Sequence, residues 1–222
     1  MSRGSVRGAS VPASPASAVP APSPRKAAGP KRAGLPNEVR LIGGSLRRSR
    51  LPVLARPGLR PTPDRVRETL FNWLGQDLQG WRCLDAFAGS GALGFEAASR
   101  GAGQVSLVER DAMLADSLRS SAARLKATAV QVIQADALVW MKRAAPASFE
   151  LVLLDPPFDA DLHAPALAAA APLVTPGGWL YLESAASLRD DALPAGFSIW
   201  RQGQAGAVHF HLLQCSNPMP NG

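Results

Sequence analysis

Short apolar runs alternate with stretches of helical periodicity along most of the chain. The apolar runs are CLDAF (83–87), QVSLVE (104–109), VQVI (130–133), ELVLLD (150–155) and GWLYLE (178–183). The helical stretches between them cover residues 92–100, 112–126, 137–143 and 164–171. Near-continuous apolar strands separated by helices are typical of a parallel sheet that is covered on both faces. The pattern therefore predicts an α/β fold.

The C-terminal pattern differs because no helix separates its last two strands. FSIWRQGQAGAVHFHLLQ (197–214) contains two β-like runs joined by a glycine-containing turn, which predicts an antiparallel hairpin. With the five preceding strands it makes a seven-stranded, mostly parallel sheet. This arrangement is commoner among methyltransferases than among NAD enzymes, so we expect the Rossmann-like class I methyltransferase fold by analogy.

A small basic element is predicted before the sheet. VRLIGG, beginning at Val39, forms one short strand that ends in a Gly-Gly turn, and SRLPVL (49–54) returns as its partner. Arg47, Arg48 and Arg50 lie at the bend of this hairpin. The hairpin therefore presents a group of arginines together.

A helix is predicted within RPTPDRVRETLFNWLG (60–75). Thr62 is the expected cap and Pro63 suits the first helical position. Its apolar face is formed by Val66, Leu70, Trp73 and Leu74. Arg65 and Arg67 fall on other faces, where we expect them to be available to a partner.

Four segments are expected along the chain. Residues 1–36 contain seven prolines, many Ala and Ser and no acid, so we expect a disordered basic tail. The prolines argue against an amphipathic transit peptide. Residues 37–78 form the basic hairpin and helix, 79–216 the methyltransferase domain and 217–222 a C-terminal tail.

The charge is concentrated at the N-terminal end of the chain. Residues 1–68 contain 14 Lys/Arg and three Asp/Glu, whereas residues 69–222 contain 10 and 14, and the whole chain carries +7. A basic front on a weakly acidic body indicates a polyanionic partner, most often nucleic acid or ribonucleoprotein.

Cysteine and hydropathy patterns exclude several classes of protein. The two cysteines, Cys83 and Cys215, form no C-x-x-C pair and no His cluster accompanies them, so neither a metal site nor a disulfide framework is expected. No apolar stretch is long enough to span a membrane. A cytoplasmic monomer is the default expectation.

The loop DAFAGSGALG (85–94) carries the first chemical signal. Gly89, Gly91 and Gly94 have the G-x-G-x-x-G spacing of a dinucleotide-binding turn. Asp85, however, ends the first strand of the sheet and would repel a diphosphate at short range. The same carboxylate would attract the ammonium and sulfonium groups of S-adenosylmethionine. The sign of the charge therefore favours S-adenosylmethionine over NAD.

Two further acids follow the next two strands. Glu109 lies 18 residues after Gly91, where a carboxylate accepts from ribose hydroxyls in either cofactor. Asp136 follows the third strand and is expected to accept from an adenine amino group, with the Ala137 N–H facing a ring nitrogen. The predicted cofactor-binding residues are Asp85, Ala88, Gly89, Ser90, Gly91, Glu109, Arg110, Asp136 and Ala137.

The tetrad Asp155-Pro156-Pro157-Phe158 is the most specific motif, and it follows the fourth strand. An exocyclic nucleobase amine is a poor nucleophile because its lone pair is delocalised into the ring. The Asp155 carboxylate and the Pro156 carbonyl would accept its two hydrogens and favour a pyramidal nitrogen. Pro157 helps to hold that carbonyl stiffly, and Phe158 offers a ring on which an unstacked base lies. These four residues are the predicted catalytic set.

With these motifs the chain resembles the RsmD-type methyltransferases, which modify guanine N2 in bacterial small-subunit (16S) ribosomal RNA. The resemblance runs from about Val39 to Gln214 and includes RLIGG, PGLRPTPDRVRETLFNWL, CLDAFAGSGALGFEAASRGA, LLDPPF and AGAVHFHLLQ. It implies a flipped guanine and an assembling 30S subunit as substrate. The chain departs from the family pattern at three places: Leu46 stands where a Trp is usual, RRSR (47–50) replaces the usual basic run, and Pro63 stands where a Thr is usual. These positions are expected to contact RNA or to shape the hairpin. The predicted RNA-binding residues are Arg40, Arg47, Arg48, Arg50, Arg60, Arg65 and Arg67.

Three alternatives stay open at the level of sequence. The tetrad suits any exocyclic amine, so adenine N6 in DNA or another ribosomal RNA base is an alternative target. An NAD-dependent oxidoreductase would need a catalytic His, Tyr–Lys or Cys, whereas His163, His209 and His211 are better explained as surface or sheet residues. A non-catalytic RNA-binding protein that kept the fold is the third.

Overall fold

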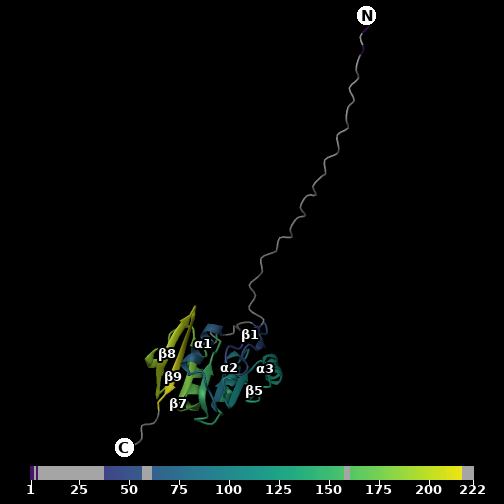
Figure 1. The fold of residues 1–222 in the computed structure, drawn as a ribbon. Helices are drawn as coiled ribbons and strands as arrows, with labels where there is room; N and C mark the ends of the chain where they lie inside the picture. Colours follow the sequence, from purple (N-terminus) through teal and green to yellow (C-terminus); the bar gives the residue numbers. More distant parts are fainter. Residues whose placement is uncertain (3, 5–37, 57–61, 158–160, 217–222) are drawn as a thin grey trace, which may run out of the picture. The chain divides into compact units, whose positions relative to one another are not determined.

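The structure, a computed structural model, describes residues 1, 2, 4, 38–56, 62–157 and 161–216 (Figure 1). The chain divides into two units, Met1–Ala33 and Gly34–Gly222, and every helix and strand below lies in the second. Two predicted site residues, Arg60 and Phe158, lie outside the described residues. The tail predicted over 1–36 lies almost wholly outside them, and the tail at 217–222 does so entirely.

The main sheet contains seven strands, as the pattern predicts. They are β3 (Arg82–Asp85), β4 (Gln104–Glu109), β5 (Val130–Gln134), β6 (Phe149–Leu154), β7 (Val174–Ser184), β8 (Phe197–Ala205) and β9 (Val208–Cys215). Their order is β5-β4-β3-β6-β7-β9-β8. The first five are parallel, and β9 pairs antiparallel with both β7 and β8. Figure 1 shows β8 and β9, in yellow, beside β7. The predicted seven-stranded sheet and its closing hairpin are confirmed.

In the part of the chain that the structure describes, five helices accompany the sheet. They are α1 (Asp64–Trp73), α2 (Ala92–Ser99), α3 (Ala112–Leu125), α4 (Ala137–Met141) and α5 (His163–Ala170), with 3-10 turns η2 (Ala171–Leu173) and η3 (Asp190–Ala192). Apolar residues of α1, α2 and α3 form one buried cluster with one face of the sheet, and those of α4 and α5 form a second with the other. Cys83, fully buried on β3, is a core residue as predicted.

The order of connections fixes where a ligand binds. The chain passes from β3 outward to β4 and β5, then returns to the other side of β3 through β6 and β7. In doubly wound sheets, ligands lie beyond the carboxyl ends of the strands where this reversal occurs. The switch point lies between β3 and β6. Strand β3 ends at Asp85, and β6 ends at Leu154, immediately before Asp155.

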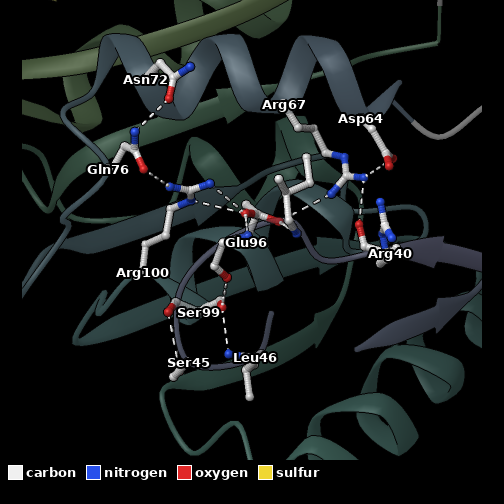
Figure 2. Close-up of polar contacts among 12 residues, drawn as sticks. Arg40, Ser45, Leu46, Asp64, Arg67, Asn72, Gln76, Glu96, Ser99 and Arg100 are labelled. Atoms are coloured by element: carbon white, nitrogen blue, oxygen red, sulfur yellow. Dashed lines mark hydrogen bonds and ion pairs between the residues drawn. The ribbon is translucent and has the colours of Figure 1, made fainter. Parts of the chain in front are cut away.

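The predicted N-terminal hairpin is present, with β1 (Glu38–Arg40) antiparallel to β2 (Arg50–Pro52). Its Gly-Gly segment does more than turn the chain, because it packs against α2. A Cβ on Gly44, which has a φ of +70°, would lie 1.7 Å from the Ser99 carbonyl oxygen. The Ser45 N–H donates to that oxygen at 2.7 Å, and the Leu46 N–H donates to Ser99 Oγ at 2.8 Å (Figure 2).

A buried carboxylate joins the hairpin to α1 and α2. Glu96, fully buried on α2, accepts from the backbone N–H groups of Ile42 and Gly43 at 2.9 and 2.8 Å. It also pairs with Arg100 at 2.9 Å and with Arg67 at 3.4 Å, between which it lies in Figure 2. The basic hairpin is therefore held on the helix that follows the glycine loop.

Arg67 corrects one prediction. Its side chain is fully buried, and its guanidinium donates to Glu96, to Asp64 at 2.6 Å and to the Arg40 carbonyl oxygen at 2.9 Å (Figure 2). It also donates to the Thr62 carbonyl oxygen at 3.2 Å. A side chain with these internal partners is not available to RNA. Arg67 is a structural residue that ties α1 to the hairpin, whereas Arg40, Arg47, Arg48, Arg50 and Arg65 are exposed.

Candidate active site

A cavity of about 450 Å³ opens at the carboxyl ends of β3, β4, β5 and β6. It is lined by residues from the glycine loop, from the three strand-end acids and from the tetrad. The lining includes Asp85, Ala88, Gly89, Ser90, Glu109, Arg110, Asp136, Ala137, Asp155, Pro156 and Pro157. Eight of the nine predicted cofactor contacts therefore lie in one cavity with three residues of the predicted catalytic set.

Gly91, the ninth predicted cofactor contact, does not line the cavity. It precedes α2 as its N-cap, with a left-handed backbone φ of 78° that favours glycine. Gly94 packs inside the fold, since a Cβ there would lie 2.1 Å from Leu107 Cδ2. Of the three motif glycines, Gly89 alone lines the cavity, while the other two shape the turn and its packing.

Asp85 is the buried acid at the base of the cavity, with 2% of its surface exposed. Its Oδ2 accepts from the Gly94 N–H at 2.9 Å. Burial, opposed by the Gly94 hydrogen bond and assisted by the nearby charges of Glu109 and Glu183, raises the pKa of Asp85 to about 7. Among the residues that the structure describes, no Lys, Arg or His pairs with it. A buried carboxyl that faces a cavity without a basic partner suits a cationic ligand.

The other two acids are held by backbone N–H groups. Glu109 Oε2 accepts from the Gly89 N–H at 2.9 Å, and its Oε1 accepts from the Asp111 N–H at 2.8 Å. Asp136 caps α4, where its Oδ1 accepts from the Val139 N–H at 3.0 Å. Carboxylate oxygens have further lone pairs, so both side chains keep acceptor capacity toward the cavity. Their contacts to ribose and adenine stay predictions.

Thr62 contacts the tetrad instead of capping the helix, which the sequence pattern does not predict. The helix begins one residue later than predicted, with Pro63 as an N-cap that makes no side-chain bond. Thr62 instead donates from Oγ1 to Asp155 Oδ2 at 3.3 Å. The capping prediction is wrong because Pro63, not Thr62, takes the N-cap position; the Thr62 hydroxyl instead donates to a residue 93 positions away.

Arg56 is a second residue of the cavity that sequence reasoning misses. Its Nε donates to Asp111 Oδ2 at 3.0 Å, and both residues line the cavity. The pKa of Asp111 is held below its usual value, first by the Leu114 N–H and then by Arg56. No local motif marks this pair, because its members are 55 positions apart in the sequence.

No helix in the described part is both long and apolar enough to cross a bilayer. Within 38–56, 62–157 and 161–216, no group of His, Cys, Asp or Glu side chains is arranged to hold a metal ion.

The chain is similar to a named family along most of its length. The model of the family "Conserved hypothetical protein 95" matches residues 39–214. Ribosomal RNA small subunit methyltransferase D of Escherichia coli is 40% identical over 183 residues, which is 80% of this chain and 90% of that protein. The solved structure of yhhF from Escherichia coli has a TM-score of 0.72 at 38% identity, covering 82% of this chain and 99% of that one.

A more distant structure supports the fold. An RNA methyltransferase from Salinibacter ruber, solved with S-adenosyl-L-homocysteine, covers 73% of this chain and 97% of its own, with a TM-score of 0.54 at 17% identity. The class I methyltransferase fold expected from the strand pattern is therefore confirmed. The family match covers the same residues as the motif resemblance, so the chain belongs to the Conserved hypothetical protein 95 family, the RsmD-type methyltransferases.

Proposed function

We propose that this protein transfers a methyl group from S-adenosylmethionine to the exocyclic N2 amine of a guanine in small-subunit (16S) ribosomal RNA. One observation carries the proposal: Asp155, Pro156 and Pro157 line the same cavity as Asp85 and Glu109. A site for a cationic donor and a site for an amine acceptor are thus side by side. The name of the Escherichia coli relative, a ribosomal RNA small subunit methyltransferase, supports the class of substrate.

The residues of the donor half fit S-adenosylmethionine. Asp85 faces the ammonium and sulfonium charges, Glu109 accepts from the ribose hydroxyls, and Asp136 with the Ala137 N–H meets the adenine edge. Gly89 allows the backbone to approach the ligand closely. When bound, S-adenosylmethionine supplies an electrophilic methyl group.

The residues of the acceptor half prepare the amine. The Asp155 carboxylate and the Pro156 carbonyl accept the two N2 hydrogens, so the nitrogen lone pair is free to attack. Thr62 holds one Asp155 oxygen by a hydrogen bond, and Pro157 limits movement of the carbonyl. As the new N–C bond forms and the donor S–C bond breaks, the nitrogen becomes acidic and its extra proton passes to Asp155.

The exposed basic hairpin extends this site toward RNA. Arg40, Arg47, Arg48 and Arg50 lie on β1, on β2 and at the bend between them, and Arg65 lies on α1. Arginines on such a surface bind phosphates without reading sequence. The proposal includes a monomeric enzyme without a metal ion that acts on an assembling 30S subunit.

The test is methylation of defined substrates by the full chain. Small subunits lacking the modification, naked 16S RNA and DNA are incubated with isotope-labelled S-adenosylmethionine, and the nucleosides are identified by mass spectrometry. We expect N2-methylguanosine from the small subunit, and D155N should abolish transfer while calorimetry still detects binding of S-adenosylmethionine. Label in N6-methyladenine, or an active D155N, would overturn the proposal.

A further inference from the structure

A second buried carboxyl lies beside Asp155. Strands β6 and β7 are parallel with Leu153 opposite Tyr181 and Leu154 opposite Leu182, so Asp155 and Glu183 directly follow the last paired positions. Side chains alternate along a strand, which places Tyr181 and Glu183 on the same face of β7, while the Thr62 hydroxyl bonds Asp155 immediately after β6. Glu183 is 3% exposed, and the mechanism above gives it no role.

Two hydroxyl groups contact this carboxyl pair. The Thr62 hydroxyl donates to Asp155 Oδ2 at 3.3 Å, and Thr62 is near enough to Glu183 to lower the pKa of that carboxyl. The Tyr181 hydroxyl donates to Glu183 Oε1 at 3.0 Å. One Thr hydroxyl between two carboxyls donates to one of them and accepts from the other when that group is protonated. The geometry thus suits a pair that holds one proton.

The surroundings of the pair favour a single negative charge. The titratable groups that face the pair are Asp85 on β3 and Tyr181 on β7. Thr62, which precedes α1, also lies beside the pair, and its carbonyl oxygen accepts a hydrogen bond from Arg67. Burial raises the pKa of Asp155 well above its usual value, and the charges of Glu183 and Asp85 raise it further. Burial also raises the pKa of Glu183. Among the described residues neither carboxyl forms an ion pair, so nothing cationic offsets a second charge.

We propose that Glu183 is a positioning residue of the acceptor half, which forms a one-proton carboxyl pair with Asp155 across the Thr62 hydroxyl and thereby sets the pH at which Asp155 accepts the target amine. Asp155 must be ionised to accept both an amine hydrogen and, later, the proton released after transfer. A charged Glu183 opposes that ionisation. Only the link to the amine rests on the proposed function, because the pair exists in the protein without substrate.

The test uses E183Q and T62V in the full chain. E183Q removes the neighbouring charge but keeps an oxygen for Tyr181, so the acid limb of the single-turnover rate should move to lower pH by about one unit or more. T62V removes a donor to Asp155, so the acid limb should move to higher pH. Unfolding midpoints check that both variants fold. A loss of rate that is equal at all pH values in E183Q would assign Glu183 a purely structural role and overturn the inference.

A second readout does not depend on the RNA substrate. Infrared spectra of the chain alone, recorded through a pH titration, report the C=O stretch of protonated carboxyl groups. E183Q should lack one such group, and the remaining Asp155 signal should disappear at lower pH than in the unmodified protein. An unchanged titration would overturn the carboxyl pair. A shifted titration in a protein that methylates no RNA would instead contradict the proposed function.

Discussion

Replacement of the buried Glu96 carboxylate tests how the hairpin is attached to the domain. E96Q keeps the shape of the side chain but removes its charge and converts one of its two acceptor oxygens into a donor. Arg100 and Arg67, which are 5% and 0% exposed in their side chains, would then lose their shared anion. The N–H group of Ile42 or Gly43 would face an amide NH₂ group.

The expected loss of stability is large for a single oxygen-to-nitrogen exchange. Removing one partner of a buried ion pair destabilises a protein by about 3–5 kcal/mol, a large part of the roughly 5–15 kcal/mol that separates folded from unfolded states. For a domain of this size, each kcal/mol lowers the melting temperature by about 2–4 °C, so we expect a decrease of about 6–20 °C.

The assay is thermal and urea unfolding followed by circular dichroism. The matched control is D116N, which breaks the exposed Asp116–Arg119 pair on α3 and should change stability by less than about 0.5 kcal/mol. Limited proteolysis of E96Q should also cut at the hairpin sooner than in the unmodified chain. If E96Q unfolds within about 1 kcal/mol of the D116N control, the carboxylate is not what holds α1, α2 and the hairpin together.

Two further predictions concern the ligands. Because the pKa of Asp85 is raised to about 7, its carboxyl becomes neutral as the pH falls through that value, so affinity for S-adenosylmethionine should decrease from about pH 8 to pH 6. Calorimetry should show that D85N binds S-adenosylmethionine more weakly and that its affinity depends less on pH. If the affinity of D85N depended on pH as strongly as that of the unmodified protein, a group other than Asp85 would be the one that titrates. Replacing Arg47, Arg48 and Arg50 together by Ala should reduce the slope of log affinity for RNA against log salt by about two to three, at about 0.7–0.9 per phosphate contact. The control R189A removes an exposed arginine between β7 and β8 and should leave the slope unchanged; an equal effect of both variants would place the RNA elsewhere.

The order of the elements and the chemistry at the strand ends can be predicted from the amino-acid sequence alone. Apolar periodicity is a local property, so the positions of β3 to β9 follow from runs of a few residues. Parallel strands bring their carboxyl ends to one edge, which is why the sequence predicts Asp85, Glu109, Asp136 and Asp155 at one site. The structure places all four around one cavity.

The contacts between polar side chains that are far apart in the sequence become visible only in the folded protein. Arg67 has the periodicity of a surface residue, yet it is buried against Glu96, 29 positions away. Thr62 has the sequence context of a cap, yet its hydroxyl bonds Asp155. In the sequence, Glu183 is an ordinary residue near the end of a strand. The pairing of β7 with β6 is what brings it near Asp155. Such pairs leave no local pattern in the sequence, because each contact forms between segments that are far apart in the chain. Only the complete fold determines how far these polar side chains are removed from water.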